Sequence, residues 1–273
     1  MHVGVKLGLT TGREAAELAL KAEKLGYHSL WLSERVAVPL DKAHPYEPSI
    51  DPWIGLAFIA AATQRLVLGT TVSQIALRDP VLMARELATL DILSEGRTIV
   101  GAGAGWVEAE FEATGVDFAT RGGRLSEFVR VLRKLWTAPE EGWNGKYFHI
   151  PGVALVRPYT PGGPPIYLGA GTPAGIRRVV HYGDGFIAVT LPLEGAAAMR
   201  KQVLEQREKL GKPPIPVWVQ VEPPETIAAA REIGTRYREA GIDGVILSER
   251  RAREAGFPAD DEVSLALIEA AAV

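Results

Sequence analysis

The chain contains no cysteine among its 273 residues. It therefore cannot form a disulfide, use a thiol as a nucleophile, or hold zinc or an iron–sulfur cluster through cysteine. Its five histidines, His2, His28, His44, His149 and His181, are scattered without the spacing of metal ligands. The H-E-x-x-H, G-x-S-x-G and P-loop motifs are missing as well. The sequence predicts no metal site, and it disfavours metalloenzyme and serine-hydrolase activities.

The chain also lacks a large excess of charge of either sign, and it lacks long apolar runs. The net charge is −3 and no long basic run is present, so we expect no binding to nucleic acid or to an anionic membrane. No apolar run approaches the roughly 18 residues that a membrane span needs. The first residues, MHVGVKLGLTTGRE, do not follow the plan of a signal peptide. We therefore expect a cytoplasmic protein.

What the chain does contain is a regular alternation of short apolar runs and longer helical patterns. The expected strands are Val3–Leu9, Ser29–Leu32, Leu66–Thr70, Thr98–Ala102, Pro165–Leu168, Gly185–Val189, Val217–Val221 and Gly244–Leu247. The expected helices are Arg13–Leu25, Pro52–Thr63, Pro80–Leu93, Glu108–Leu135, Gly175–His181, Leu193–Leu210, Thr226–Ala240 and Asp260–Ala272. Within Glu108–Leu135, for example, Leu125, Phe128, Val129 and Leu132 follow the spacing of one buried helix face.

Eight such strand–helix units fit a closed (β/α)8 TIM barrel, an α/β fold, in one domain spanning residues 1–273. The strands are continuous apolar runs, which is typical of strands covered on both faces. A doubly wound open sheet is the alternative, because periodicity does not show closure.

Two segments exceed the needs of a minimal barrel. Val36–Asp51 is a long loop after the second strand, on the face where barrel enzymes keep their active sites. A packing loop is the alternative interpretation. Ala138–Pro164 contains NGKYFHI and VALV, which we expect to form a small inserted hairpin before the fifth strand.

The first candidate site follows the fourth strand, at GAGAGW. Gly103 and Gly105 let backbone N–H groups approach a ligand that a Cβ would exclude, and Trp106 precedes an acidic helix start. A helix N-terminus beyond them favours an anion. A cofactor phosphate would fit here, although a simple tight turn explains the glycines equally well.

A second glycine-rich strand end is LGAGTP, with Gly169, Ala170, Gly171 and Thr172. Thr172 can cap the following helix, and Pro173 suits its first position. The same hydroxyl and the nearby N–H groups could hold a phosphate. Two such ends on adjacent strands favour a phosphate-bearing ligand without identifying it.

Charged residues follow the second strand, at Glu34 and Arg35. The end of a barrel strand is where chemistry takes place, and Arg35 could bind an anionic substrate or stabilise a reduced anionic cofactor. The alternative is a structural ion pair of Arg35 with Glu34 at the barrel rim. After the third strand, Thr71–Val72 leads to Arg78–Asp79–Pro80, where Asp79 would cap a helix in an ordinary loop.

Several long motifs then occur in an order that resembles the luciferase-like monooxygenase superfamily. They are SLWLSE, RLVLGTTVSQIALRDPVLMARELATLDILSEGR, GAGAGWVEAEFEATGVDFATRGGRLSEFVRVLRKLW, GKYFHIPGVALVRP and PPIYLGAGTPAGIRRVVHYGDGF. The resemblance runs from about residue 3 to 190, and residues 191–273 match only in their strand and helix rhythm. The chain is most similar to the small F420-dependent oxidoreductases of this superfamily.

The resemblance implies a (β/α)8 barrel that binds F420, or alternatively FMN, at the carboxyl ends of the strands. A bulge after the third strand, often with a non-proline cis peptide, would support the cofactor ring, and it maps to Thr71–Val72. The cofactor phosphate would lie near Gly103–Trp106 and Gly169–Thr172. Relatives also form homodimers, so we expect one here.

The sequence departs from the family pattern at four positions. Arg35 stands where many relatives have a histidine, so a permanent cation replaces a proton-shuttling group. Val107 stands for a common asparagine, and Ala170 for a second glycine. Ala104 stands where the branch that oxidises sugar phosphates has an acid, so that reaction is not expected.

We therefore expect an oxidoreductase that transfers hydride between F420 and a small organic substrate, with Glu34 and Arg35 near the reactive ring. One alternative is an FMN-dependent monooxygenase supplied by a partner flavin or F420 reductase. A second is a non-catalytic flavin-binding barrel. A third, a phosphate-binding aldolase or isomerase, would need a Schiff-base lysine at a strand end, and none of the expected strands ends in one.

Overall fold

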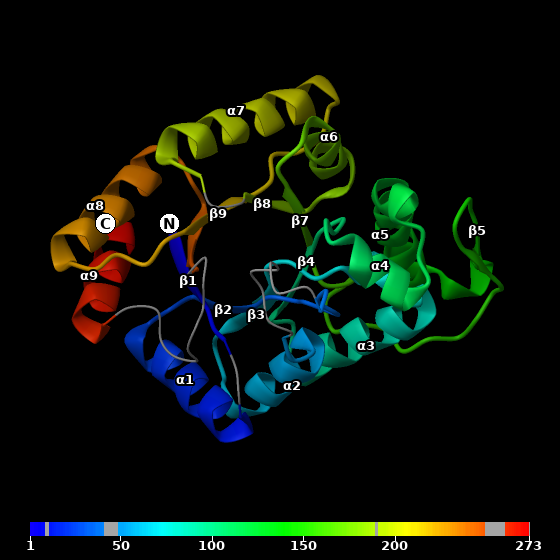
Figure 1. Cartoon of the computed structure of the whole chain (residues 1–273), viewed down its shortest axis with the longest axis horizontal. Coiled ribbons are helices and arrows are strands. Elements are labelled where there is room, and N and C mark those ends of the chain that lie inside the picture. The colour runs from blue at the N-terminus through cyan, green and yellow to red at the C-terminus, as the bar shows by residue number, and fades with distance from the viewer. Residues whose placement is uncertain (9–10, 41–48, 189–190, 249–259, 273) are drawn as a thin grey trace.

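Eight parallel strands close into a barrel in the computed structural model of the chain (Figure 1). The structure describes residues 1–8, 11–40, 49–188, 191–248 and 260–272. The barrel strands are β1 (His2–Lys6), β2 (Ser29–Leu32), β3 (Val67–Thr70), β4 (Thr98–Ala102), β7 (Ile166–Ala170), β8 (Gly185–Ala188), β9 (Val217–Val221) and β10 (Gly244–Leu247). Because β1 pairs with both β2 and β10, the sheet has no edge, and the closed barrel is confirmed over the open sheet.

Helices surround these strands (Figure 1). They are α1 (Gly12–Leu25), α2 (Pro52–Ala62), α3 (Pro80–Leu93), α4 (Glu108–Thr114), α5 (Arg121–Thr137), α6 (Pro173–Tyr182), α7 (Leu193–Lys209), α8 (Ile227–Glu239) and α9 (Asp261–Ala272). Asp51 and Asp79 cap α2 and α3, each by accepting two backbone N–H bonds ahead of a proline at the helix start. The cap expected from Asp79 is thus confirmed.

The single helix expected over Glu108–Leu135 is wrong. Gly115 ends α4 at φ +70°, a left-handed conformation that suits glycine. Asp117 then caps a short 3-10 turn, Phe118–Thr120, before α5 begins. The buried face predicted from Leu125 to Leu132 does lie on α5.

The inserted hairpin is confirmed at its expected position in the chain, but its strand pairing differs from the prediction. β5 (Trp143–Asn144) pairs antiparallel with β6 (His149–Ile150), whereas the VALV segment forms no strand. Glu127 of α5 explains why the hairpin forms at these residues. Its carboxylate accepts hydrogen bonds from Trp143 Nε1 at 3.1 Å and from the backbone N–H groups of residues 146–148. Burial alone would raise the pKa of Glu127, but these donors hold it below its ordinary value.

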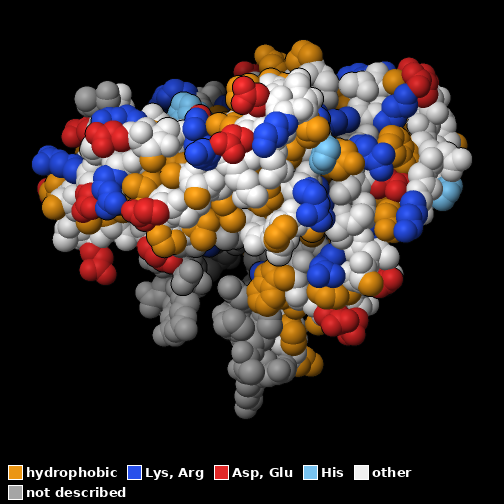
Figure 2. Space-filling model, turned by 90° about the horizontal axis from the view of Figure 1, so that it is seen from above, with side chains coloured by type: hydrophobic (Ala, Val, Ile, Leu, Met, Phe, Trp, Pro, Cys, Tyr) orange, Lys and Arg blue, Asp and Glu red, His pale blue; other side chains and the backbone are white. Residues whose placement is uncertain are grey.

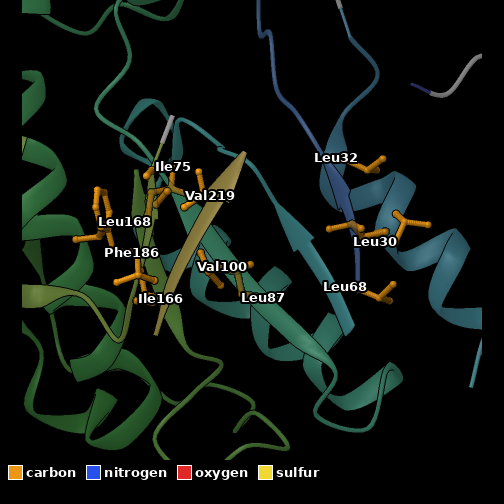
Figure 3. Packing of buried hydrophobic residues seen from close by; sticks show 14 of the residues in the cluster. Leu30, Leu32, Leu68, Ile75, Leu87, Val100, Ile166, Leu168, Phe186 and Val219 are labelled. Carbon is orange, nitrogen blue, oxygen red and sulfur yellow. The ribbon is translucent and has the colours of Figure 1, made fainter. Parts of the chain in front are cut away.

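Two apolar regions fill the fold. One lies between the barrel and the helices, where Figure 3 shows strand residues such as Leu30, Val100 and Leu168 and Leu87 of α3. The other lies inside the barrel and is made by Trp31, Ile99, Ile187, Trp218 and Ile246.

The tryptophans inside the barrel require glycine on neighbouring strands. A Cβ at Gly69 would come within 2.4 Å of the Trp31 ring, and one at Gly244 within 2.4 Å of the Trp218 ring. The two rings lie 5.4 Å apart between centroids and pack in the same interior cluster.

A histidine pair lies at the amino ends of the barrel strands. The ring centroids of His2 and His28 are 3.8 Å apart, and Trp218 lies 5.7 Å from His28. Burial, and secondarily the charge of His2, lowers the pKa of His28 from 6.5 to about 4. Burial also lowers the pKa of His2. Both rings are therefore neutral in the folded protein at pH values where the unfolded chain is protonated.

The free energy of unfolding should consequently fall as the pH drops from about 6.5 towards about 4. At pH 5 we expect His28 to account for about 1 kcal/mol of this loss, since partial exposure reduces the full linkage value. Urea unfolding of His28→Gln at pH 7 and pH 5 should show a smaller pH effect than the parent protein. His149→Gln, at an exposed position of β6, is the control. An equal pH effect in His28→Gln and the parent would contradict the assignment.

Candidate functional site

The chain forms a bulge where β3 ends. The Thr71–Val72 peptide is cis, at the bond where the family resemblance placed it. Beyond it, Ser73 rejoins the barrel, because its N–H donates to the Gly101 carbonyl at 2.8 Å and its carbonyl accepts from Gly103 N at 2.9 Å. Thr71 N–H still donates to the Leu32 carbonyl at 2.8 Å, so the bulge lies between this bond to β2 and the isolated bridge of Ser73 with Ala102 of β4.

Val72 packs against the two glycine-rich strand ends. A Cβ at Gly103 would lie 2.6 Å from Val72 Cγ2, and one at Gly169 would lie 3.0 Å from Val72 Cγ1. The structure thus brings together Val72, Gly103 and Gly169, three residues that the sequence predicted separately. The hydroxyl of Thr71 is buried and makes no hydrogen bond within the described part of the chain.

Glu34, which follows β2, binds the segment that comes after this bulge. Its side chain is almost fully buried, and Oε2 accepts from Ser73 Oγ at 2.7 Å and from Gln74 N at 2.6 Å. Oε1 accepts from the guanidinium of Arg78. Both carboxylate oxygens are therefore bound by donors that follow the bulge, which ties the end of β2 to the segment after β3.

Arg78 also binds Asp51, the cap of α2, with Nη2 2.7 Å from Oδ2. Burial would lower the pKa of Arg78, but the adjacent Glu34 carboxylate, with Asp51, raises it. Burial would raise the pKa of Asp51, but Arg78 and the first N–H groups of α2 lower it. Each of these two shifts favours the charged form of its side chain, and sequence reasoning had assigned no role to Arg78 or Asp51.

Arg35 takes a different partner from the one considered in the sequence. Its Nη1 lies 3.3 Å from Oε2 of the buried Glu110 on α4, and not beside Glu34, the partner that the sequence offered as an alternative. Glu110 also accepts from Val36 N at 2.9 Å and from Gln74 Nε2 at 2.7 Å. The acidic start of α4 therefore binds the segments that follow both β2 and β3.

Trp106 lies beside Arg35, whose guanidinium carbon is 5.1 Å from the ring centroid. The ring is 57% exposed, while Val107 behind it is buried and caps α4 with its backbone only. Gly105, at φ +77°, brings the chain close to Gln74, whose Oε1 would lie 2.4 Å from a Cβ. Of the loop Val36–Asp51, residues 41–48 lie outside the described residues.

The second glycine-rich end leads directly into α6. Thr172 Oγ1 accepts from Gly175 N at 3.1 Å, as expected of the cap, and Gly171 and Thr172 are exposed. Ala170 is buried beneath α6, and its Cβ lies 2.8 Å from where a Cβ on Gly175 would be. The alanine that replaces the family glycine therefore faces the helix and not the exposed strand end.

One sequence expectation about strand ends is wrong. β1 ends at Lys6, three residues earlier than expected, so this lysine stands at the carboxyl end of a barrel strand. Leu9 and Val189, which were expected to end the first and sixth strands, lie outside the described residues. No group of three or more His, Asp or Glu side chains that could hold a metal occurs among the residues described.

The residues present fit a flat ring with a phosphate-bearing tail. The buried Thr71 hydroxyl has no hydrogen-bond partner among the described residues, so it can bind a polar atom of a ring resting on the bulge. The exposed N-terminus of α6, with its Thr172 cap, lies at the end of the neighbouring strand. Its first N–H groups suit an anion.

Comparison with known proteins agrees with this architecture. The family model of luciferase-like monooxygenases matches residues 2–223. The uncharacterized protein Rv0953c of Mycobacterium tuberculosis is 30% identical over 252 residues, covering 86% of this chain and 89% of that protein. The F420-dependent glucose-6-phosphate dehydrogenase of Kineococcus radiotolerans is 35% identical over 180 residues, but the match spans only 52% of its length and 64% of this chain.

Solved structures share the whole fold. An F420-dependent secondary alcohol dehydrogenase in complex with an F420-acetone adduct superposes with a TM-score of 0.77 at 20% identity, covering 100% of this chain and 98% of that one. The monooxygenase RslO1 from Streptomyces bottropensis superposes with a TM-score of 0.73 at 24% identity, covering 98% and 88%. Because the family model matches most of the chain, the chain belongs to the luciferase-like monooxygenase family of oxidoreductases.

Proposed function

We propose that the protein transfers hydride between the deazaflavin F420 and a small organic substrate. The observation that carries this proposal is the bulge at Thr71–Val72, which rests on Gly103 and Gly169 and presents a buried hydroxyl that no described residue binds. Relatives named as F420-dependent glucose-6-phosphate dehydrogenases support the choice of F420. The half-buried Ala104 in place of the acid makes a sugar phosphate a poor substrate.

In this proposal the chain's residues have separate roles. Val72 supports the ring, while the segments Gly103–Trp106 and Gly169–Thr172 hold the phosphate with backbone N–H groups. When bound, reduced F420 supplies the hydride. Glu34 holds the bulge in position through Ser73, Gln74 and Arg78, and Arg35 places a positive charge beside the ring.

Cofactor binding tests the proposal directly. The purified protein should quench the fluorescence of F420 with a dissociation constant in the micromolar range or below. Titration with FMN under the same conditions ranks the two cofactors. Failure of both to bind at micromolar concentrations would overturn the proposal, and preference for FMN would favour the second candidate.

That second candidate is an FMN-dependent monooxygenase supplied by a partner flavin reductase. The family description and the structural similarity to monooxygenase RslO1 favour it. Oxygen consumption separates the two functions, because a monooxygenase consumes O2 with reduced FMN and substrate, whereas hydride transfer from F420 needs none.

Arg35 offers a test that does not require the substrate. A cation beside the ring stabilises an anionic reduced cofactor, so removing it should lower the reduction potential. For Arg35→Ala we expect a decrease of about 30 mV, which corresponds to about 1.4 kcal/mol for a two-electron couple. Spectroelectrochemical titration of the holoenzyme measures it. Arg231→Ala, an exposed position on α8, is the control, and an unchanged potential in Arg35→Ala would remove the role assigned to Arg35.

The homodimer remains a proposal, supported by apolar side chains on the outer faces of α2 and α3. Ile54 is 74% exposed, Phe58 51%, Leu82 50% and Leu93 63%. Surfaces of this kind mark protein–protein contacts. We expect Phe58→Glu to convert a dimer into monomers in sedimentation velocity, whereas Leu210→Glu, equally exposed at the end of α7, should leave it intact. A monomeric parent protein would contradict the proposal.

The remaining expectations concern location and other partners. None of the described helices is long and apolar enough to cross a membrane. Figure 2 shows basic and acidic side chains intermixed over the face drawn, without a field of one sign that would attract a polyanion. A small-molecule substrate and a cytoplasmic location stay proposals.

A further inference from the structure

Strand alternation determines which side chains enter the barrel between Trp31 and Trp218 and the carboxyl ends of the strands. Successive side chains of a strand point to opposite faces. Trp218 of β9 and Ile246 of β10 lie in the interior cluster. A Cβ on Gly4 of β1 would meet Trp31 Nε1 at 2.6 Å, so Gly4 also faces inward.

Two residues further along each of these strands, the inward positions are polar. They are Gln220 after Trp218, Ser248 after Ile246 and Lys6 after Gly4. Ser248 Oγ donates to Gln220 Oε1 at 3.1 Å, and this contact shows that the two side chains share the same face. We call Lys6, Gln220 and Ser248 the polar arc.

The polar arc lies across the barrel from the glycine-rich strand ends. Around the closed sheet the order is β1-β10-β9-β8-β7-β4-β3-β2. With eight strands, β9 stands opposite β3, β10 opposite β4 and β1 opposite β7. Because side chains fill the interior of such a barrel, a ligand binds over the carboxyl ends of its strands. A substrate next to a ring on Val72 would therefore have the polar arc on its other side.

The polar arc presents hydrogen-bond donors. Because Ser248 occupies the carbonyl oxygen of Gln220, the Gln220 Nε2 amide remains to donate to a ligand. The Lys6 ammonium only donates. Such a pair suits an acceptor oxygen on the substrate.

The charge around the polar arc favours a neutral molecule. Glu222 follows Gln220 by two residues and is exposed at the end of β9, next to Ser248, whose N–H donates to the Val221 carbonyl at 2.9 Å. Its carboxylate repels an anionic ligand at this end of the barrel, which disfavours a carboxylate or phosphate there.

We propose that Lys6 and Gln220 form a substrate-binding subsite that orients a neutral carbonyl compound by its oxygen. This inference rests on the proposed function, because the cofactor ring defines the opposite wall. These two residues would determine which substrate is accepted.

Binding of two matched probes tests the subsite. Protein saturated with oxidised F420 is titrated with cyclohexanone and with cyclohexanecarboxylate, and the change in F420 absorbance reports binding. We expect the ketone to bind the parent holoenzyme more tightly than the carboxylate. Lys6→Met and Gln220→Leu should each weaken ketone binding about tenfold while leaving F420 affinity within twofold.

Lys6→Arg retains the donor and should restore most of the ketone affinity, a result that a merely structural role would not produce. Lys24→Met, at an exposed site on α1, is the matched control and should have no effect. The subsite is overturned if the parent holoenzyme binds no ketone, or if Lys6→Met and Gln220→Leu both bind the ketone as tightly as the parent does. Tighter binding of the carboxylate overturns the neutral substrate class. Absence of F420 binding in the parent protein is the separate failure of the proposed function.

Discussion

Gly103→Ala is expected to reduce F420 affinity about 100-fold while the barrel stays folded. The added Cβ would lie 2.6 Å from Val72 Cγ2, closer than van der Waals contact permits. Valine is stiff at χ1, so relief requires the Thr71–Val72 bulge itself to shift. A displacement of about 1 Å at a positioned ring is enough for an effect of this size.

Two further variants make this prediction specific. Gly8→Ala adds the same methyl group beyond the end of β1, where no atom of the described residues lies within 4 Å, and it should leave affinity unchanged. Val72→Ala removes the methyl groups that Gly103→Ala would strike, so the double variant should bind F420 better than additivity of the single changes predicts. Fluorescence titration measures the F420 affinity of the parent protein and of the four variants. Strictly additive losses would show that Val72 does not transmit the effect.

The strands were the most predictable part of the fold. Four strands have the predicted bounds, because each is an apolar run bounded by polar residues or glycine. They are Ser29–Leu32, Thr98–Ala102, Val217–Val221 and Gly244–Leu247. Closure was not predictable from periodicity, since it depends on the pairing of β1 with β10. The break between α4 and α5 was missed because apolar spacing continues across Gly115.

The candidate site shows the same division between local and long-range information. Glycine-rich strand ends are visible in the sequence, and the resemblance identified the bulge at Thr71–Val72. The ion pairs were not predictable, because the two partners of each lie far apart in sequence: Glu34 with Arg78, and Arg35 with Glu110. Among the residues described, the adjacent Glu34 and Arg35 form no pair with each other.

Glu34→Ala is expected to lower the free energy of unfolding by about 3 kcal/mol and to weaken F420 binding strongly. The change leaves the Ser73 hydroxyl, the Gln74 N–H and the Arg78 guanidinium without their acceptor in a buried site. Removing one member of a buried ion pair typically costs about 3–5 kcal/mol. Asp51 still binds Arg78, which places the expected loss at the lower end. Urea unfolding and fluorescence titration measure the two effects.

Glu34→Gln separates a positioning role from proton transfer. Glutamine keeps the shape and one acceptor oxygen but loses the charge opposite Arg78, so stability and cofactor affinity should both fall, by less than in Glu34→Ala. Glu205→Gln, in the exposed pair with Lys201, should change stability by about 0.5 kcal/mol or less. Full stability and cofactor affinity in Glu34→Gln, with hydride transfer lost, would instead identify Glu34 as an acid or base. Donors from the segment after the bulge already bind Oε2 twice and Oε1 once, which favours the positioning role for Glu34.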